Sequence, residues 1–209
     1  MDIKKTANLF VNFTIRRLAE IFGLIIFSTG ILILLALLTY SPEDPNFIFP
    51  DNTEIKNILG FKGSFVSDLF FQSLGLVSYL FSLTLVATGV NIFRSKDFFL
   101  LIENIFFAII YSILGTLFLT HFYSNAFTLY INGNGGFVGI YLNETFLKSL
   151  ILINEKIFYY VLIILNIFLF LISVNFHLVK FYEIVKKLIK FFKKNEKQIY
   201  NDKSEIISE

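Results

Sequence analysis

Few residues in this sequence could carry chemistry, and their spacing does not build a reaction centre. The two histidines, His121 and His177, each lie near one end of a long apolar segment. One predicted membrane span separates them, so they cannot share a metal ion within one subunit. We interpret both as polar anchors at a membrane interface. The chain has no cysteine, which excludes thiol catalysis, disulfides and cysteine-ligated zinc.

The sequence also lacks the motifs of nucleotide binding and hydrolysis. No Gly-Lys-Ser or Gly-Lys-Thr occurs, and residues 62–64 read Lys-Gly-Ser, the wrong order for a phosphate-binding loop. Gly133 and Gly135 begin a G-x-G-x-x-G pattern, but its sixth position is Val138. We therefore predict no catalytic residue, no cofactor site and no metal site, and expect this chain not to be an enzyme.

One acid, Glu103, falls inside a predicted membrane span. Ionisable groups within a span are candidates for ion or proton pathways. Glu103 lies about one and a half turns from the end of its segment at Phe98, at 3.6 residues per turn. It can therefore snorkel to the interface or pair with Arg94 or Lys96. We interpret Glu103 as a structural residue, with a pathway role as the alternative.

The composition is that of an integral membrane protein. Hydrophobic residues make up 56% of the 209 residues and charged residues 16%, whereas soluble domains average about 45–50% and about 25%. Mean hydropathy is +0.71, and the apolar residues form continuous runs. So few charges could not coat a soluble globule of this length.

Four apolar segments are long enough to cross a bilayer as helices, since about 20 residues span a hydrocarbon core of about 30 Å. They form a four-span domain at 19–180, after a polar and basic cytoplasmic leader at 1–18. A basic amphipathic segment at 181–209 begins a cytoplasmic linker. The first span is expected to be an uncleaved anchor because it is longer than a signal-peptide core. The predicted spans are residues 21–40, 69–93, 98–120 and 157–179.

The connections between the spans predict an all-α bundle. Residues 94–97 join the second and third spans so tightly that the two must form an antiparallel hairpin. The apolar stretch 137–153 is interrupted by Asn143, Glu144 and Lys148, so it is too short and too polar to span. We predict a short amphipathic or re-entrant helix there. Ala108, Ser112 and Thr116 recur every four residues and predict a helix-packing seam.

The distribution of basic residues predicts that both termini are cytoplasmic, because Lys and Arg concentrate in inner segments. Only four of the 18 basic residues, Lys56, Lys62, Lys148 and Lys156, fall in the two outer loops. The inner segments hold the other 14: Lys4, Lys5, Arg16, Arg17, Arg94, Lys96, Lys180, Lys186, Lys187, Lys190, Lys193, Lys194, Lys197 and Lys203.

Several loop motifs occur in a characteristic order. Ser41–Phe47 reads SPEDPNF after the first span, and Asn57–Phe65 and Asp68–Phe71 lead into the second. Gly75–Tyr79 follows, and Gly135–Gly139 reads GGFVG before the fourth span. Over most of residues 16–180 this order resembles the N-terminal four-span domain of the FtsK/SpoIIIE DNA translocases, in which S/N-P-x-D-P-S/N-aromatic and GGxxG motifs occupy the same places.

The resemblance implies a membrane anchor in the bacterial inner membrane at the division septum. In that family this domain holds a hexameric cytoplasmic ATPase that pumps chromosomal DNA, so a homo-oligomer and divisome membrane proteins are the implied partners, besides the lipid bilayer. The family's motor has no counterpart in these 209 residues. No direct nucleic-acid binding is expected, because a basic segment beside a span more often binds lipid headgroups. The motif residues are expected to shape the outer loops or to bind a septal partner: Ser41, Pro42, Asp44, Pro45, Gly60, Gly63, Asp68, Gly135, Gly136 and Gly139.

Two other functions stay open from the residues alone. A small transporter or channel subunit would show paired charges or Gly/Pro-broken helices inside the membrane, whereas Glu103 stands alone and no proline lies in a predicted span. A membrane-bound lipid enzyme would gather His, Asp or Arg at one interface, and the sequence shows no such cluster.

Overall fold

The computed structural model describes residues 3–45, 54–124, 132–177 and 186, and within these ranges all regular structure is helical. The all-α prediction is therefore confirmed. The helices are α1 (Ile3–Leu38), α2 (Gly60–Leu74), α3 (Val77–Ser95), α4 (Phe99–Phe122), α5 (Gly136–Asn143), α6 (Phe146–Ile153) and α7 (Glu155–Ser173).

Four of the described helices are long and apolar enough to cross a membrane, as the sequence predicts. They are Asn8–Leu38 of α1 together with the whole of α3, α4 and α7. Helix α1 also takes in the predicted leader from Ile3 onward, because no proline or glycine precedes Gly23 to end the helix. Its 36 residues are about 54 Å long, which exceeds a hydrocarbon core of about 30 Å.

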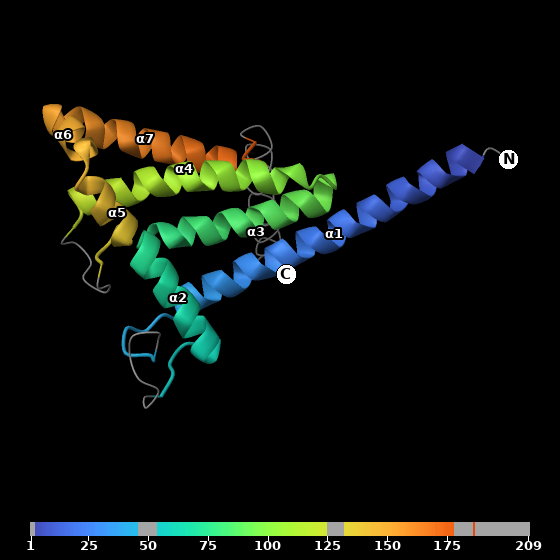
Figure 1. Cartoon of the computed structure of the whole chain (residues 1–209), viewed down its shortest axis with the longest axis horizontal. Coiled ribbons are helices and arrows are strands. Elements are labelled where there is room, and N and C mark those ends of the chain that lie inside the picture. The colour runs from blue at the N-terminus through green and yellow to red at the C-terminus, as the bar shows by residue number, and fades with distance from the viewer. Residues whose placement is uncertain (1–2, 46–53, 125–131, 178–185, 187–209) are drawn as a thin grey trace, which may run out of the picture. The chain divides into compact units, whose positions relative to one another are not determined.

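The spanning helices pack in chain order, with α1 beside α3, α3 beside α4, and α4 beside α7 (Figure 1). Glycine brings the first pair into backbone contact. A Cβ atom on Gly89 of α3 would lie 2.3 Å from the backbone nitrogen of Phe27, and one on Gly23 of α1 would lie 2.7 Å from that of Phe93. Small residues permit such close approach, which supplies dispersion energy between helices in lipid.

The predicted second span, 69–93, is wrong in its first part, because the helix breaks at Gly75. Gly75 has φ 58° and ends α2. The next backbone N–H, of Leu76, donates to the carbonyl of Asn134 at 2.9 Å. Helix α2 is therefore a separate short helix, which lies across the Leu38 end of α1, and of the two helices only α3 is long and apolar enough to span a membrane (Figure 1).

The predicted hairpin is formed by α3 and α4. Lys96 adopts φ 63° and its N–H donates to the Ile92 carbonyl, while the Asp97 carboxylate accepts the N–H of Phe99 at 2.9 Å. We call this the hairpin end of the domain. The opposite end, where α1 ends and α2, α5 and α6 lie, is the loop end. At the hairpin end Glu20 of α1 bonds to Arg17 at 2.6 Å and to Lys96 at 2.8 Å.

The fourth span ends earlier than predicted. Helix α7 begins at Glu155, where the Asn154 side chain accepts the N–H of Ile157, and it ends at Ser173. Asn175, at φ 53°, turns the chain there and donates to the Asn104 side chain at 3.0 Å. The predicted basic amphipathic segment at 181–209 lies outside the described residues, except for Lys186.

The short helix predicted in the second loop is present as two helices, α5 and α6. They are bent by 72° relative to each other, and each has eight residues, about 12 Å at 1.5 Å per residue. Thr145 starts α6 by accepting the N–H of Leu147. Neither helix spans a bilayer alone.

We expect Gly89→Leu to lower the free energy of unfolding of the purified protein by about 1–3 kcal/mol, the usual cost of overpacking. The added side chain would push α3 off the α1 backbone. Thermal unfolding in detergent, followed by circular dichroism, measures the change. Val90→Leu is the matched control, since Val90 is the next residue and is 38% exposed. Equal melting temperatures for the two variants would contradict the contact.

Candidate functional site

The first loop is held together by Asp44, which is buried in the described structure. One carboxylate oxygen accepts the backbone N–H of Lys56 at 2.8 Å and the other accepts that of Asn57 at 2.8 Å. On the other side, the N–H of Asp44 donates to the Ser41 carbonyl at 3.2 Å, which closes a turn through Pro42. Asp44 thus joins the start of the loop to its end.

Asn57 carries this connection into the end of α1. Its side-chain amide donates to the Ala36 carbonyl at 2.9 Å and to the Thr39 carbonyl at 3.3 Å. The last carbonyls of a helix have no partner in their own helix, so Asn57 acts as their cap. A Cβ atom on Gly63 would lie 2.1 Å from the Asn57 side-chain oxygen. Glycine at position 63 is therefore required by the buried asparagine.

The polar face of α2 completes the cluster around the first loop. The Ser64 hydroxyl donates to the Pro45 carbonyl at 3.1 Å, and the Tyr40 hydroxyl donates to Asp68 at 3.3 Å. Gly60 begins α2 at φ 65°, and its N–H donates to the Asn57 carbonyl. All seven predicted residues of the first loop and α2 therefore lie in one network at the loop end.

The first loop also carries an ion pair on its surface. The Lys56 ammonium lies 2.5 Å from the Glu43 carboxylate. This hydrogen bond and charge hold the pKa of Glu43 below its ordinary value and raise that of Lys56. Because both side chains are exposed, the pair adds little to stability.

The three glycines of the second motif seat α5 against its neighbours. Cβ atoms on Gly135 and Gly139 would lie 2.1 and 2.2 Å from the Thr120 hydroxyl of α4, and one on Gly136, at φ 63°, would lie 2.6 Å from the backbone of Ser73 in α2. The Asn132 side chain donates to the Gln72 carbonyl at 3.2 Å. Helix α5 is thus fixed between the ends of α2 and α4.

The two motif regions, far apart in sequence, therefore meet through α2. We call this assembly the loop-end cap: residues 40–45, 57–75 and 132–143. It contains all ten motif residues singled out in the sequence. Sequence reasoning missed Asn57 and Asn134 as key members, although both lie inside or beside the motifs. Asn134 is buried and supplies the carbonyl that receives the Leu76 N–H.

Neither the predicted packing seam nor the intramembrane acid Glu103 belongs to the loop-end cap. Ala108, Ser112 and Thr116 are all buried on α4. Glu103 is exposed on the side of α4 that no described helix covers. Lys96, one of its two predicted partners, pairs with Glu20.

Polar contacts also join the spans away from the cap. Thr84 bonds to the hydroxyls of Tyr111 at 2.9 Å and Ser173 at 3.1 Å. Asn104 donates to Thr88 at 2.9 Å, and all of these residues are buried. They link α3, α4 and α7. Thr84 and Thr88 are four residues apart, the spacing of one helix face, whereas Asn104, Tyr111 and Ser173 are isolated polar residues whose spacing gave no signal.

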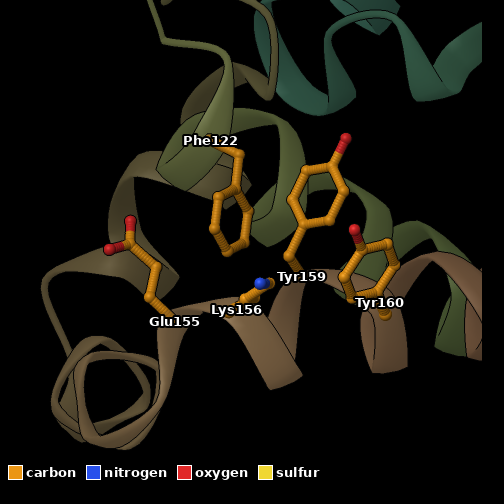
Figure 2. A pocket seen from close by; sticks show the side chains of 5 residues that line it. All are labelled: Phe122, Glu155, Lys156, Tyr159 and Tyr160. Atoms are coloured by element: carbon orange, nitrogen blue, oxygen red, sulfur yellow. The ribbon is translucent and has the colours of Figure 1, made fainter.

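A shallow pocket of about 310 Å³ lies where α4 ends and α7 begins, lined by Phe122, Glu155, Lys156, Tyr159 and Tyr160. Figure 2 shows the Glu155 carboxylate directed away from the two tyrosines, with the Phe122 ring between. Glu155 lies 3.7 Å from the Nε2 atom of His121, and the Tyr159 hydroxyl bonds to that of Tyr123 at 2.7 Å. Tyrosines in this place are typical of a membrane interface.

The chemistry of the cap is that of a scaffold. Its carboxylates and amides bind backbone groups of the same chain, as the bonds of Asp44 and Asn57 show. Among the described residues no group of three or more His, Asp or Glu side chains could hold a metal ion.

We expect Asp44→Ala to destabilise the protein more than any substitution of a neighbouring surface residue. It removes two hydrogen bonds to a carboxylate, each worth about 1.5–3 kcal/mol, and leaves two backbone N–H groups unpaired, of which that of Asn57 is buried. Glu43→Ala is the matched control, because it removes an exposed carboxylate one residue away and should leave the melting temperature unchanged. Equal melting temperatures for the two variants would show that Asp44 does not hold the loop.

Comparisons with known proteins agree with the resemblance in the loop motifs. The chain is 26% identical to the DNA translocase FtsK of Rickettsia typhi over 175 residues, which cover 80% of this chain and 22% of that protein. It is 29% identical over 98 residues to the DNA translocase FtsK of Rhizobium meliloti, covering 47% of this chain and 11% of the relative. The chain thus spans at most about a fifth of these relatives. No solved structure gives a significant match.

The family model for the 4TM region of DNA translocase FtsK/SpoIIIE matches residues 15–186. The match includes α1 from Ile15 onward, the whole of α3, α4 and α7, and the whole loop-end cap. This chain is a multi-pass membrane protein that belongs to the FtsK/SpoIIIE 4TM family.

Proposed function

We propose that this chain is the membrane anchor and interaction module of an FtsK-like DNA translocase, which it targets to the division septum of the bacterial inner membrane. The observation that carries the proposal is the loop-end cap. All ten motif residues lie in one assembly on one side of the membrane domain, which is the arrangement expected of a surface that meets a partner.

The charge distribution supports an orientation with the loop end outside and both termini in the cytoplasm. The loop end holds Lys56, Lys62, Lys148 and Lys156, whereas Arg94 and the other 13 basic residues fall in the segments assigned to the inner side. Because Lys and Arg concentrate on the cytoplasmic side of membrane proteins, the end with more basic residues is assigned to the cytoplasm. Divisome membrane proteins with domains outside the membrane are then the partners that the cap can reach.

Helix α5 supplies the exposed part of this surface. Its glycines face α2 and α4, while Phe137 and Tyr141 point outward, each 62% exposed, with their rings stacked at 6.4 Å. Aromatic side chains bury large areas at little entropic cost and are enriched in protein interfaces. The pair is therefore the part of the cap that we assign to partner binding.

The DNA-pumping activity is assigned to parts of the full translocase that lie outside this chain. The relatives are named as DNA translocases and are about five to ten times longer than their matched segments. The anchor would hold such a motor at the membrane, and assembly of several anchors would follow from a hexameric motor. The exposed position of Glu103 lends no support to an ion pathway through the bundle.

A fluorescent fusion of this chain, expressed in dividing bacteria, tests the proposal. The wild-type fusion should concentrate at mid-cell, and Phe137→Ala with Tyr141→Ala should spread over the membrane at equal expression. Phe106→Ala is the control, because Phe106 is 59% exposed on α4 away from the cap. Uniform membrane fluorescence of the wild-type fusion in cells with intact septa would refute the septal role.

A further inference from the structure

An apolar groove lies between α1 and α2. Its volume is about 300 Å³. Helix α1 contributes Thr29, Leu32 and Ala36, and Leu59, Lys62 and Val66 line the other side. The Thr29 hydroxyl donates to the Ile25 carbonyl of its own helix, so it offers no free donor to the groove.

This groove lies within the membrane. Thr29 is nine residues, about 14 Å, from the end of α1 at Leu38, which is about half the thickness of a hydrocarbon core. Asn57 binds the Ala36 carbonyl, so the chain enters α2 at the other end of the groove, near the interface. The groove therefore runs from the interface at the loop end toward the middle of the bilayer.

The lining of the groove suits a hydrocarbon chain. Thr29 and Ala36 are about 10 Å apart along α1, and the lining between the two helices is apolar apart from Thr29, whose hydroxyl is satisfied, and Lys62. An extended acyl chain makes dispersion contacts along such a lining.

The positive charge of Lys62 determines which class of lipid suits this groove. Lys62 is exposed at this groove and forms no ion pair with any residue that the structure describes. Its apolar stem can lie along the groove while its ammonium reaches the headgroup level. Phe61, Phe65 and Leu69 are exposed on α2, which places this helix among lipids. We propose that the groove between α1 and α2 is a binding site for an anionic phospholipid, with one acyl chain in the groove and the phosphate at Lys62.

This inference is independent of the septal role, and native mass spectrometry of the purified full chain tests it. The protein in detergent is offered equal amounts of phosphatidylglycerol and phosphatidylethanolamine. The wild-type protein should retain phosphatidylglycerol about fivefold more, the preference expected of one basic residue beside an anionic headgroup. Lys62→Gln should bring the ratio near one, while Lys148→Gln, a lysine exposed on α6 away from the groove, should leave it unchanged.

Filling the groove tests the acyl-chain site separately from the charge. Thr29→Phe should lower retention of both lipids, and Val66→Phe gives a second variant if the first lowers the melting temperature. The proposal is overturned if the wild-type protein shows no preference, if Lys148→Gln acts as strongly as Lys62→Gln, or if the folded groove-filling variants retain lipid fully. Loss of a dimer mass with unchanged lipid binding would assign the groove to a second copy instead.

Discussion

A bilayer offers no hydrogen-bond partner to a backbone group that leaves a helix, and the rest of this structure depends on how that demand is met. The critical place is the end of α1, where the carbonyls of Ala36 and Thr39 emerge. The side-chain amide of Asn57 donates to both carbonyls. The Asp44 carboxylate in turn accepts the backbone N–H of Asn57 and so holds this residue in place. The position of α2 follows, because α2 begins three residues after Asn57.

The same demand is met at the other breaks in the chain. Where α2 gives way to α3, the N–H of Leu76 finds the Asn134 carbonyl, so the first and second loops must form together. Where α7 ends, the Val174 carbonyl accepts the Asn91 amide at 3.1 Å. At the ends of α1 and α7 the donor is an asparagine side-chain amide, whereas at the break between α2 and α3 Asn134 accepts with its backbone carbonyl. The loops of this domain are therefore fixed to the spans and are not independent of them.

Hydropathy was sufficient to predict the spans, the hairpin and the short helices of the second loop, because a spanning helix needs a run of apolar residues. It failed at Gly75, since one glycine in an apolar run is tolerated in many membrane helices and gives no break by itself. At this glycine φ is 58°, and a Cβ atom would lie 1.9 Å from the carbonyl oxygen of Asn134, about sixty residues away in the sequence. The cap could be listed from its motifs, but its assembly through Asn57 depends on contacts between distant segments.

The groove between α1 and α2 has the same origin as the cap. Helix α2 turns its polar residues Ser64, Ser67 and Asp68 toward the bundle, because those groups must be satisfied away from lipid. Its apolar residues then face outward, and a short helix lying across α1 cannot follow the α1 surface along its length. In water such a gap would close or fill with solvent; in a bilayer it fills with hydrocarbon, because empty apolar space forfeits dispersion contacts. The residues that hold the cap together thus also shape its lipid-facing side.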